Sequence, residues 1–185
     1  METALSPEWL TAIGTLGTFV VIAASAAAAL LQLRHMRGGN QIVALTECRE
    51  KLESDEFQVA RRFIMDELPA LLQDADLRRR FQSEPTTPNE LRPAVNVANF
   101  FESMGGFVRF GIIDCTIACS LWCGVVAGSW NQLLPMIRLR RTRDPAVWEF
   151  FEYLAAICTE FMKEHPSTYP RGAARMPIEE APADR

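Results

Sequence analysis

The stretch WLTAIGTLGTFVVIAASAAAALLQL, residues 9–33, decides the architecture of this chain. None of its side chains is charged. As an α-helix the stretch would extend about 37 Å, which is enough to cross the hydrocarbon core of a bilayer with some tilt. The sequence therefore predicts a transmembrane helix over residues 9–33 that contacts membrane lipid. Residues 1–8 would form a short N-terminus on one side of the membrane.

Basic residues flank the predicted span on one side only. Arg34, Arg37, Arg49 and Lys51 follow it, whereas no Lys or Arg precedes it. Because basic residues close to a span are retained in the cytoplasm, the part of the chain after the span should be cytoplasmic. The expected topology is therefore single-pass, with the N-terminus outside and the C-terminal domain inside.

A cleaved secretory signal peptide is the alternative interpretation of the same stretch. Residues 23–29 contain small side chains that resemble a cleavage site. A signal peptide begins with basic residues, however, and this chain begins with Glu2 and Glu8 instead. The pattern therefore favours a retained anchor.

Length, charge and cysteine content limit what else the chain can contain. Its 185 residues have room for the span, one globular domain and a short tail. The net charge of −4 argues against a nucleic-acid partner, because such proteins need a basic face to neutralise phosphates. The 5 cysteines are odd in number and three of them crowd one apolar stretch, a pattern typical of a reducing compartment.

Apolar residues recur at helical spacing after the span, and no alternating β pattern bounded by turn residues occurs. We therefore expect an all-α fold, in which the transmembrane helix precedes a compact multi-helix bundle over residues 34–164. Gly38 and Gly39 predict a flexible break between the span and the bundle. Residues 165–185 are rich in proline and predict a disordered tail.

Capping residues predict where the helices of the bundle begin and end. Ser54, Asp114 and the pair of Asp144 with Pro145 are expected to start helices, and Gly111 is expected to end one in a left-handed conformation. Between these signals the expected helices cover residues 41–53, 55–83 with a restart at Pro69, 93–110, 115–126, 130–137 and a last helix from 145.

The segment 112–134 contains one charged residue, Asp114, and could be interpreted as a second span. If the first span leaves the chain in the cytoplasm, a second span would place the arginine-rich segment 138–143 outside, against the charge rule. Asn131 and Gln132 would also be costly in hydrocarbon. These residues favour a single-pass topology.

Three cysteines, Cys115, Cys119 and Cys123, stand four residues apart and would share one side of a helix. They could form a thiol sensor, or bind a soft metal if Cys48 or Cys158 supplied further ligands. Structural zinc sites use two close pairs of ligands, however, and this spacing does not fit that template. Because the segment 115–126 is apolar on nearly every side, it should lie at the centre of the bundle with its cysteines as small core residues.

The chain offers no recognisable catalytic residues and no cofactor motif. Its two histidines, His35 and His165, flank the predicted domain and cannot complete a nucleophile–base pair within it. Glu102 and Glu152 could be paired carboxylates of a di-metal bundle, but the usual Glu-x-x-His partners are missing, so hydrogen-bonded or solvent-edge roles are expected. The pair Gly105-Gly106, inside a predicted helix, is expected to ease close packing and not to bind a ligand.

Four arginines, Arg138, Arg140, Arg141 and Arg143, form the best candidate for a surface contact. If they lie near the membrane, each could contribute about 1 kcal/mol to binding anionic headgroups. The alternative is that these cations complement the dipole at a solvated helix end.

Several short motifs together resemble a family of uncharacterised bacterial proteins in which a membrane helix precedes a helical domain of unknown function. The resemblance extends over residues 40–164, and its motifs are Asn99-Phe100-Phe101-Glu102, Gly111-Ile112-Ile113-Asp114, Trp130 with Pro135 and Arg138, and Phe151-Glu152 with Leu154. It implies a helical fold and a bacterial inner-membrane setting, but no catalytic residue. The chain departs from the family pattern in its cysteine-rich segment, where charged residues are more usual.

The sequence thus favours a non-enzymatic, membrane-tethered helical module that binds a protein partner or its own copies. The alternative is a thiol-based redox sensor or metal-binding protein that uses Cys115, Cys119 and Cys123.

Overall fold

A computed structural model describes residues 7–169 and 172–176, and all regular structure in these residues is helical. The helices are α1 (Pro7–Glu53), α2 (Asp55–Asp66), α3 (Leu68–Leu71), α4 (Ala75–Ser83), η1 (Asn89–Leu91), α5 (Arg92–Arg109), α6 (Cys115–Arg141) and α7 (Glu149–Glu164). The predicted all-α class is therefore confirmed. Residues 1–6, 170–171 and 177–185 lie outside the described part, so the predictions for the N-terminus and for most of the tail fall on undescribed residues.

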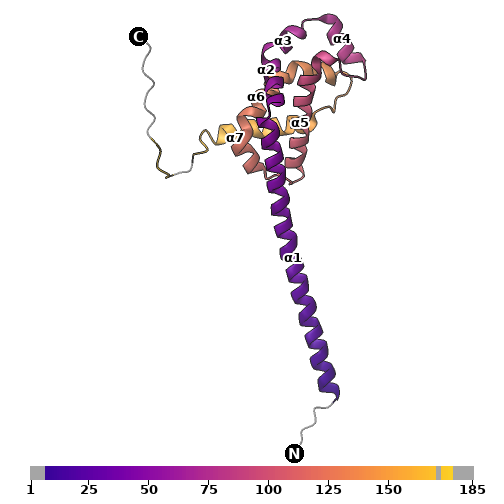
Figure 1. Ribbon diagram of the computed structural model, residues 1–185, viewed down its shortest axis with the longest axis vertical. Coiled ribbons are helices and arrows are strands. Elements are labelled where there is room, and N and C mark those ends of the chain that lie inside the picture. Colours follow the sequence, from indigo (N-terminus) through magenta and orange to yellow (C-terminus); the bar gives the residue numbers. More distant parts are fainter. Residues whose placement is uncertain (1–6, 170–171, 177–185) are drawn as a thin grey trace, which may run out of the picture.

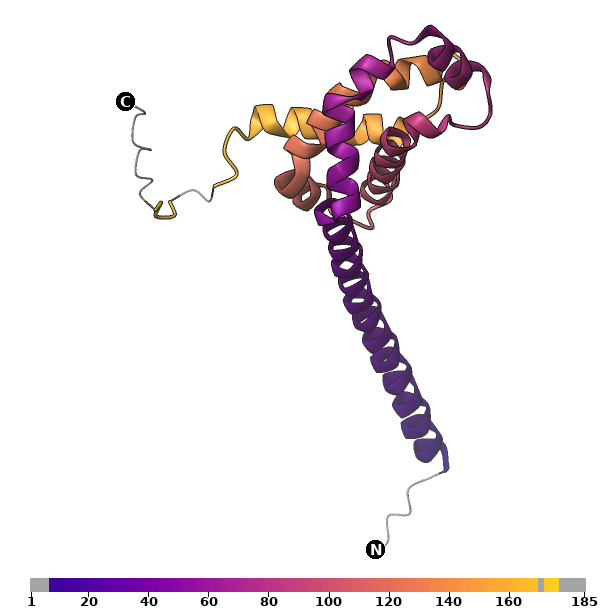
Figure 2. The same cartoon turned by 45° about the horizontal axis from the view of Figure 1, so that its top comes forward.

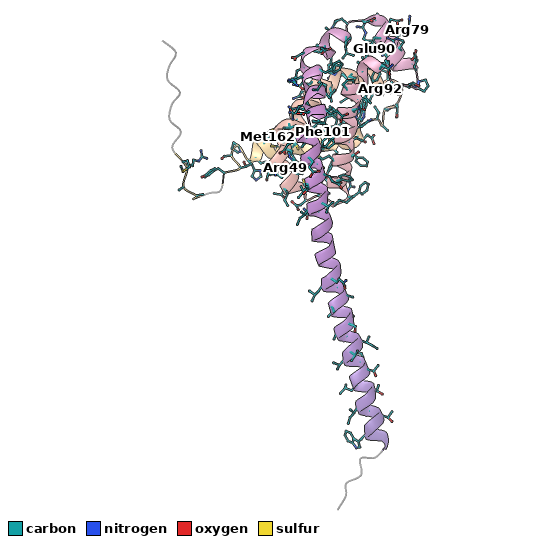
Figure 3. All side chains as sticks on the ribbon, viewed as in Figure 1. Arg49, Arg79, Glu90, Arg92, Phe101 and Met162 are labelled. Carbon is teal, nitrogen blue, oxygen red and sulfur yellow. The ribbon has the colours of Figure 1, made fainter. Side chains whose placement is uncertain are left out.

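The long helix α1 projects from a bundle formed by the other helices (Figure 1). Its section Thr11–Gln32 is long and apolar enough to cross a membrane, and none of it is buried within the protein. Side chains radiate from this section with no other helix beside it (Figure 3). By contrast, the last turns of α1 enter the bundle, where Ala44, Cys48 and Leu52 are buried. One helix therefore joins a candidate membrane span to the core of the domain.

The predicted break at Gly38 and Gly39 is wrong, because α1 continues through both residues. Each glycine costs about 1 kcal/mol in a helix interior. Helix propagation is cooperative, however, and strong helix on both sides outweighs this local cost. The candidate span and the domain are consequently joined by an uninterrupted helix.

The other capping predictions hold near the start and middle of the domain. Ser54 caps α2, since its Oγ accepts a hydrogen bond from the backbone N–H of Phe57 at 3.3 Å. Gly111 follows α5 with a φ of +70°, as its predicted left-handed role requires. The helix expected to continue to residue 83 is divided, because Asp74 accepts hydrogen bonds from two backbone N–H groups and starts α4 anew.

The core is built around α5, which packs against α2 on one side and α7 on the other. Phe101 of α5 is fully buried (Figure 3). Its ring stacks on Phe151 of α7, with centroids 5.0 Å apart, and meets Phe57 of α2 edge-on at 5.9 Å. Trp130 of α6 packs edge-on against the same Phe151 at 5.0 Å. Aromatic contacts thus connect four helices.

The helix α6 is continuous, so the predicted division into 115–126 and 130–137 is wrong. Pro135 lies inside it and removes one backbone hydrogen bond. The flanking residues Leu133, Met136 and Ile137 are almost completely buried. Burial of such side chains contributes roughly 1.5–3 kcal/mol each, which offsets the loss at the proline.

The prediction that 115–126 lies at the centre of the bundle is also wrong in part. Ala118 and Cys119 are buried, but Ile117 and Leu121 are 40% and 60% exposed. This half of α6 packs on α7 with one face and leaves the other face open. The apolar composition of this segment could not predict the exposed face. A helix that is apolar on nearly every side has no distinct stripe to show which face packs against the domain.

The last helix begins at Glu149, four residues later than Asp144 and Pro145 predict. Asp144 instead caps a turn, because its Oδ1 accepts the N–H of Ala146 at 3.2 Å. Trp148 then adopts a left-handed conformation, with φ of 57°, before α7 starts. The side chain of Asp144 therefore stabilises a turn before α7, and contacts with other helices determine that α7 starts at Glu149.

Gly105 allows the close approach of α5 to α7. A Cβ atom at this position would collide with the backbone carbonyl of Phe150. At the neighbouring Gly106 an added Cβ would have only an ordinary contact, 3.8 Å from a ring carbon of Phe150. The close packing expected of the glycine pair is therefore confirmed at Gly105 but not at Gly106.

Gly105→Ala should lower the free energy of unfolding by about 2–3 kcal/mol, because α5 and α7 must separate to admit the methyl group. Gly106→Ala is the matched control and should be neutral or stabilising, since alanine favours the helix. Denaturant unfolding of the detergent-solubilised protein, followed by circular dichroism, measures both. Equal stability of the two variants would contradict the packing described.

Candidate functional site

The motif residues of α5 are used to hold the start of α7. Glu102 accepts the backbone N–H of Phe151 at its Oε2, at 2.8 Å. Asn99 accepts the indole N–H of Trp148 at 2.8 Å. Trp148 occupies the N-cap position of α7 but its side chain makes no capping hydrogen bond. The carboxylate of Glu102 therefore caps α7 in its place, and its negative charge is favourable beside the positive end of the helix dipole. The expected hydrogen-bonded role of Glu102 is thereby confirmed.

Arg141 completes this connection from α6. Its guanidinium donates to the carbonyl oxygens of Val147 at 3.0 Å and Trp148 at 3.3 Å, and pairs with Glu152 at 2.5 Å. It also lies over the ring of Trp130, 5.7 Å from the centroid. These donors and acceptors serve contacts between helices. The cluster therefore gives the motif residues Asn99, Glu102 and Glu152 a structural role between α5, α6 and α7.

The other arginines of the predicted surface cluster lie where α6 ends beside α4. Arg140 donates to the carbonyl oxygens of Phe81 at 2.7 Å and Glu84 at 3.1 Å, and Arg143 donates to Ser83 at 3.2 Å. Arg138 is exposed. Two views place α4 at the end of the domain remote from the apolar section of α1 (Figures 1 and 2). The predicted headgroup contact required a position near the membrane, and this placement gives it no support.

The cysteines form a row of sulfurs across α6 and α7. Cys119 Sγ lies 4.0 Å from the Sγ of Cys115 and 3.9 Å from the Sγ of Cys158. Cys119 and Cys158 are buried, whereas Cys115 is exposed and Cys123 is half-buried. Cys48 is buried in α1. Cys158 of α7 thus lies in contact with the predicted row of cysteines on α6, and the row is exposed to solvent at Cys115.

Burial makes the inner thiols poor nucleophiles. Desolvation, followed by the nearby Cys115, raises the pKa of Cys119 to about 11. Desolvation likewise raises the pKa of Cys158 above its usual range. A thiol with a raised pKa is protonated at neutral pH and reacts slowly. Among the described residues no group of three or more His, Cys, Asp or Glu side chains is placed to hold a metal ion, so the metal-binding interpretation gains no support.

A groove of about 620 Å³ lies between α2 and the start of α5. Its floor is apolar, with Phe57 and Val97 buried and Val59 exposed by 55%. Charged residues of both signs line its rim: Lys51, Asp55, Glu56, Arg62, Asp66, Glu67 and Arg92. Apolar surface framed by mixed charge suits an amphipathic peptide helix.

This groove was not predicted from the sequence, although the sequence contains one signal of it. Val59 and Phe63 form an apolar pair four residues apart, beside the inward stripe of Phe57, Ala60 and Ile64. An apolar pair outside the buried stripe marks a second contact surface on the same helix. That α5 forms the other wall of the groove depends on tertiary packing and has no local sequence signal.

A family model described as Domain of unknown function (DUF4760) matches residues 19–158. The match covers most of the chain and begins inside the apolar section of α1. A search of the curated proteins and a search of the solved structures gave no match.

The cysteine row makes a labelling experiment decisive for the sensor interpretation. Maleimide should modify Cys115 rapidly in the folded protein, whereas Cys119 and Cys158 should react only after unfolding. Because the pKa of Cys119 is raised to about 11, its protection should persist at pH 9, where an ordinary thiol is largely ionised. Peptide mass spectrometry after timed labelling reports each site. Fast labelling of Cys119 at neutral pH would contradict the burial and favour a sensor.

Proposed function

The chain belongs to the DUF4760 family, a domain of unknown function, and we propose that it is a membrane-tethered helical module that binds a partner protein at the cytoplasmic face of a bacterial inner membrane. The observation that supports this most strongly is the full exposure of the apolar section Thr11–Gln32. Eight large apolar side chains there are at least 58% exposed: Ile13, Leu16, Phe19, Val20, Val21, Ile22, Leu30 and Leu31. Their transfer out of water is favourable by on the order of 10 kcal/mol.

Two features favour a retained anchor over a cleaved signal peptide. The family match includes residues 19–33, so the second half of the apolar stretch is part of the family domain. The second feature is the position of the basic residues, which follow the apolar stretch, whereas those of a signal peptide precede its apolar core. The basic residues Arg34, Arg37, Arg49 and Lys51 follow the stretch and favour a cytoplasmic domain.

The partner site in this proposal is the groove between α2 and α5. Its apolar floor around Val59 and Phe63 provides the burial that a helical peptide needs, and its rim offers both signs of charge for orientation. The motif residues Asn99, Glu102 and Glu152 are engaged in contacts between helices, which supports a role for them in a binding scaffold. A thiol sensor is the second candidate, because the sulfur row runs from the exposed Cys115 to the buried Cys158.

Membrane fractionation and a topology reporter test the anchor. Full-length protein should remain with the membrane after high-salt and alkaline washing and should require detergent for release. A reporter that works only in the cytoplasm should be active when fused after Arg185. A reporter that works only in the periplasm should be inactive at the same position. Recovery of the protein as a soluble species without detergent, or a periplasmic reporter signal, would overturn the proposal.

Crosslinking in native membranes tests the groove. Val59→Asp should reduce a discrete crosslinked species by about tenfold, because a buried charge in an apolar contact costs more than about 1.4 kcal/mol. Met65→Asp is the matched control, since Met65 lies on the same helix with 45% exposure but outside the groove. If Val59→Asp and Met65→Asp both leave the crosslinks unchanged, the groove is not the partner site. The mass of the species shows whether the partner is a second copy.

A further inference from the structure

A second apolar surface lies around the turn between α5 and α6. It consists of Phe110, Ile112, Ile117 and Leu121, which are 71%, 43%, 40% and 60% exposed. Ile113, between them, is completely buried and fixes the turn to the core. Phe110 and Ile112 lie in the turn after α5, and Ile117 and Leu121 lie in the first turns of α6. We refer to these four exposed side chains as the basal patch.

The turn between α5 and α6, which carries Phe110 and Ile112, lies at the end of the domain from which the apolar section of α1 projects (Figures 1 and 2). The opposite end of α6 contacts α4 through Arg140. Near the start of α6, Trp122 lies at the same small cavity as Arg49 and Leu52 of α1. Residues 115–121 precede Trp122, and the start of α6 lies toward the end of the domain from which α1 projects (Figure 1).

The geometry of α1 brings this end of the domain to the lipid headgroups. From Gln32, the end of the apolar section, to Gln41 is a rise of about 13 Å along the helix. The headgroup layer itself is roughly 5–8 Å thick on each side of the hydrocarbon core. Membrane helices tilt by about 20°, and a tilt of that size lowers a point about 20 Å from the helix axis by about 7 Å. A basal patch on the lowered side therefore reaches the headgroup layer.

The chemistry of the basal patch fits that layer. Phe110 is aromatic and its neighbour Arg109 is exposed, a pairing suited to the polar–apolar boundary and to anionic lipid. The nearby carboxylate of Asp114 is engaged as the cap of α6, where it accepts the N–H of Ile117 at 3.0 Å. The basic residues Arg34 and Arg37 precede the domain on the same side of the predicted span.

We propose that the basal patch docks on the lipid headgroup layer of the same bilayer that α1 spans, so that the domain lies against the membrane. This inference rests on the proposed membrane anchor. Because α1 has no hinge at Gly38 and Gly39, docking fixes the tilt of α1 and the direction in which the groove between α2 and α5 faces. It also gives the exposed apolar face at the start of α6 a role without a second span.

Photocrosslinking of the full-length protein in vesicles of phosphatidylethanolamine and phosphatidylglycerol tests the docking. A benzophenone amino acid replaces Phe110 in one sample, Met65 in a second and Phe19 in a third, and mass spectrometry counts lipid adducts. Position 19 should give abundant adducts, and position 110 should exceed position 65 by at least about fivefold. Leu121→Glu should reduce the adducts at position 110 several-fold, because a charge weakens interfacial burial.

The three positions separate failure of the docking from failure of the anchor. Adducts at position 19 with none at position 110 would overturn the docking and leave the anchor intact. Absence of adducts at position 19 would overturn the anchor and the docking together. Protein–protein adducts at position 110 in place of lipid adducts would assign the basal patch to a second copy and overturn the docking. Phe110 is 71% exposed and its ring meets that of Phe150 edge-on at 5.7 Å, so an aromatic benzophenone side chain should leave the fold intact, and circular dichroism of each sample checks this.

Discussion

The burial of the last turns of α1 in the domain core is the interaction on which the rest of the structure depends. Ala44, Cys48 and Leu52 contribute to the same core as the aromatic rings of α2 and α5. The same helix exposes an apolar section long enough to cross a bilayer. Since no break separates these sections, forces on the membrane end act directly on the core. The helix is therefore both the proposed anchor and the first structural element of the bundle.

Sequence patterns predicted the elements that depend on local chemistry. The apolar stretch of α1, the cap at Ser54 and the left-handed Gly111 each follow from short-range rules and are present in the structure. The continuity of α1 at Gly38 was not predictable from propensity, because cooperative helix formation outweighs one or two unfavourable residues. The start of α7 was missed because Glu102, from another helix, supplies the cap that Asp144 was expected to provide.

Candidate sites were harder to predict because their partners lie far away in sequence. The spacing of the cysteines placed them on one side of a helix, but only packing against α7 shows that Cys119 meets Cys158. The arginines were recognised as a cluster, yet the carbonyl groups that Arg140 binds lie in α4 and directly after it, more than fifty residues earlier. Local charge or spacing identifies residues of interest, and tertiary contacts decide whether they serve stability or binding.

The most direct test of the account is the distance between spin labels at residues 31 and 53 of the full-length protein in lipid vesicles. The account predicts one narrow distribution centred near about 33 Å, which is the rise of 22 residues of continuous α-helix. A broad distribution or a clearly shorter distance would show a break in α1, and would contradict the rigid connection between membrane and core.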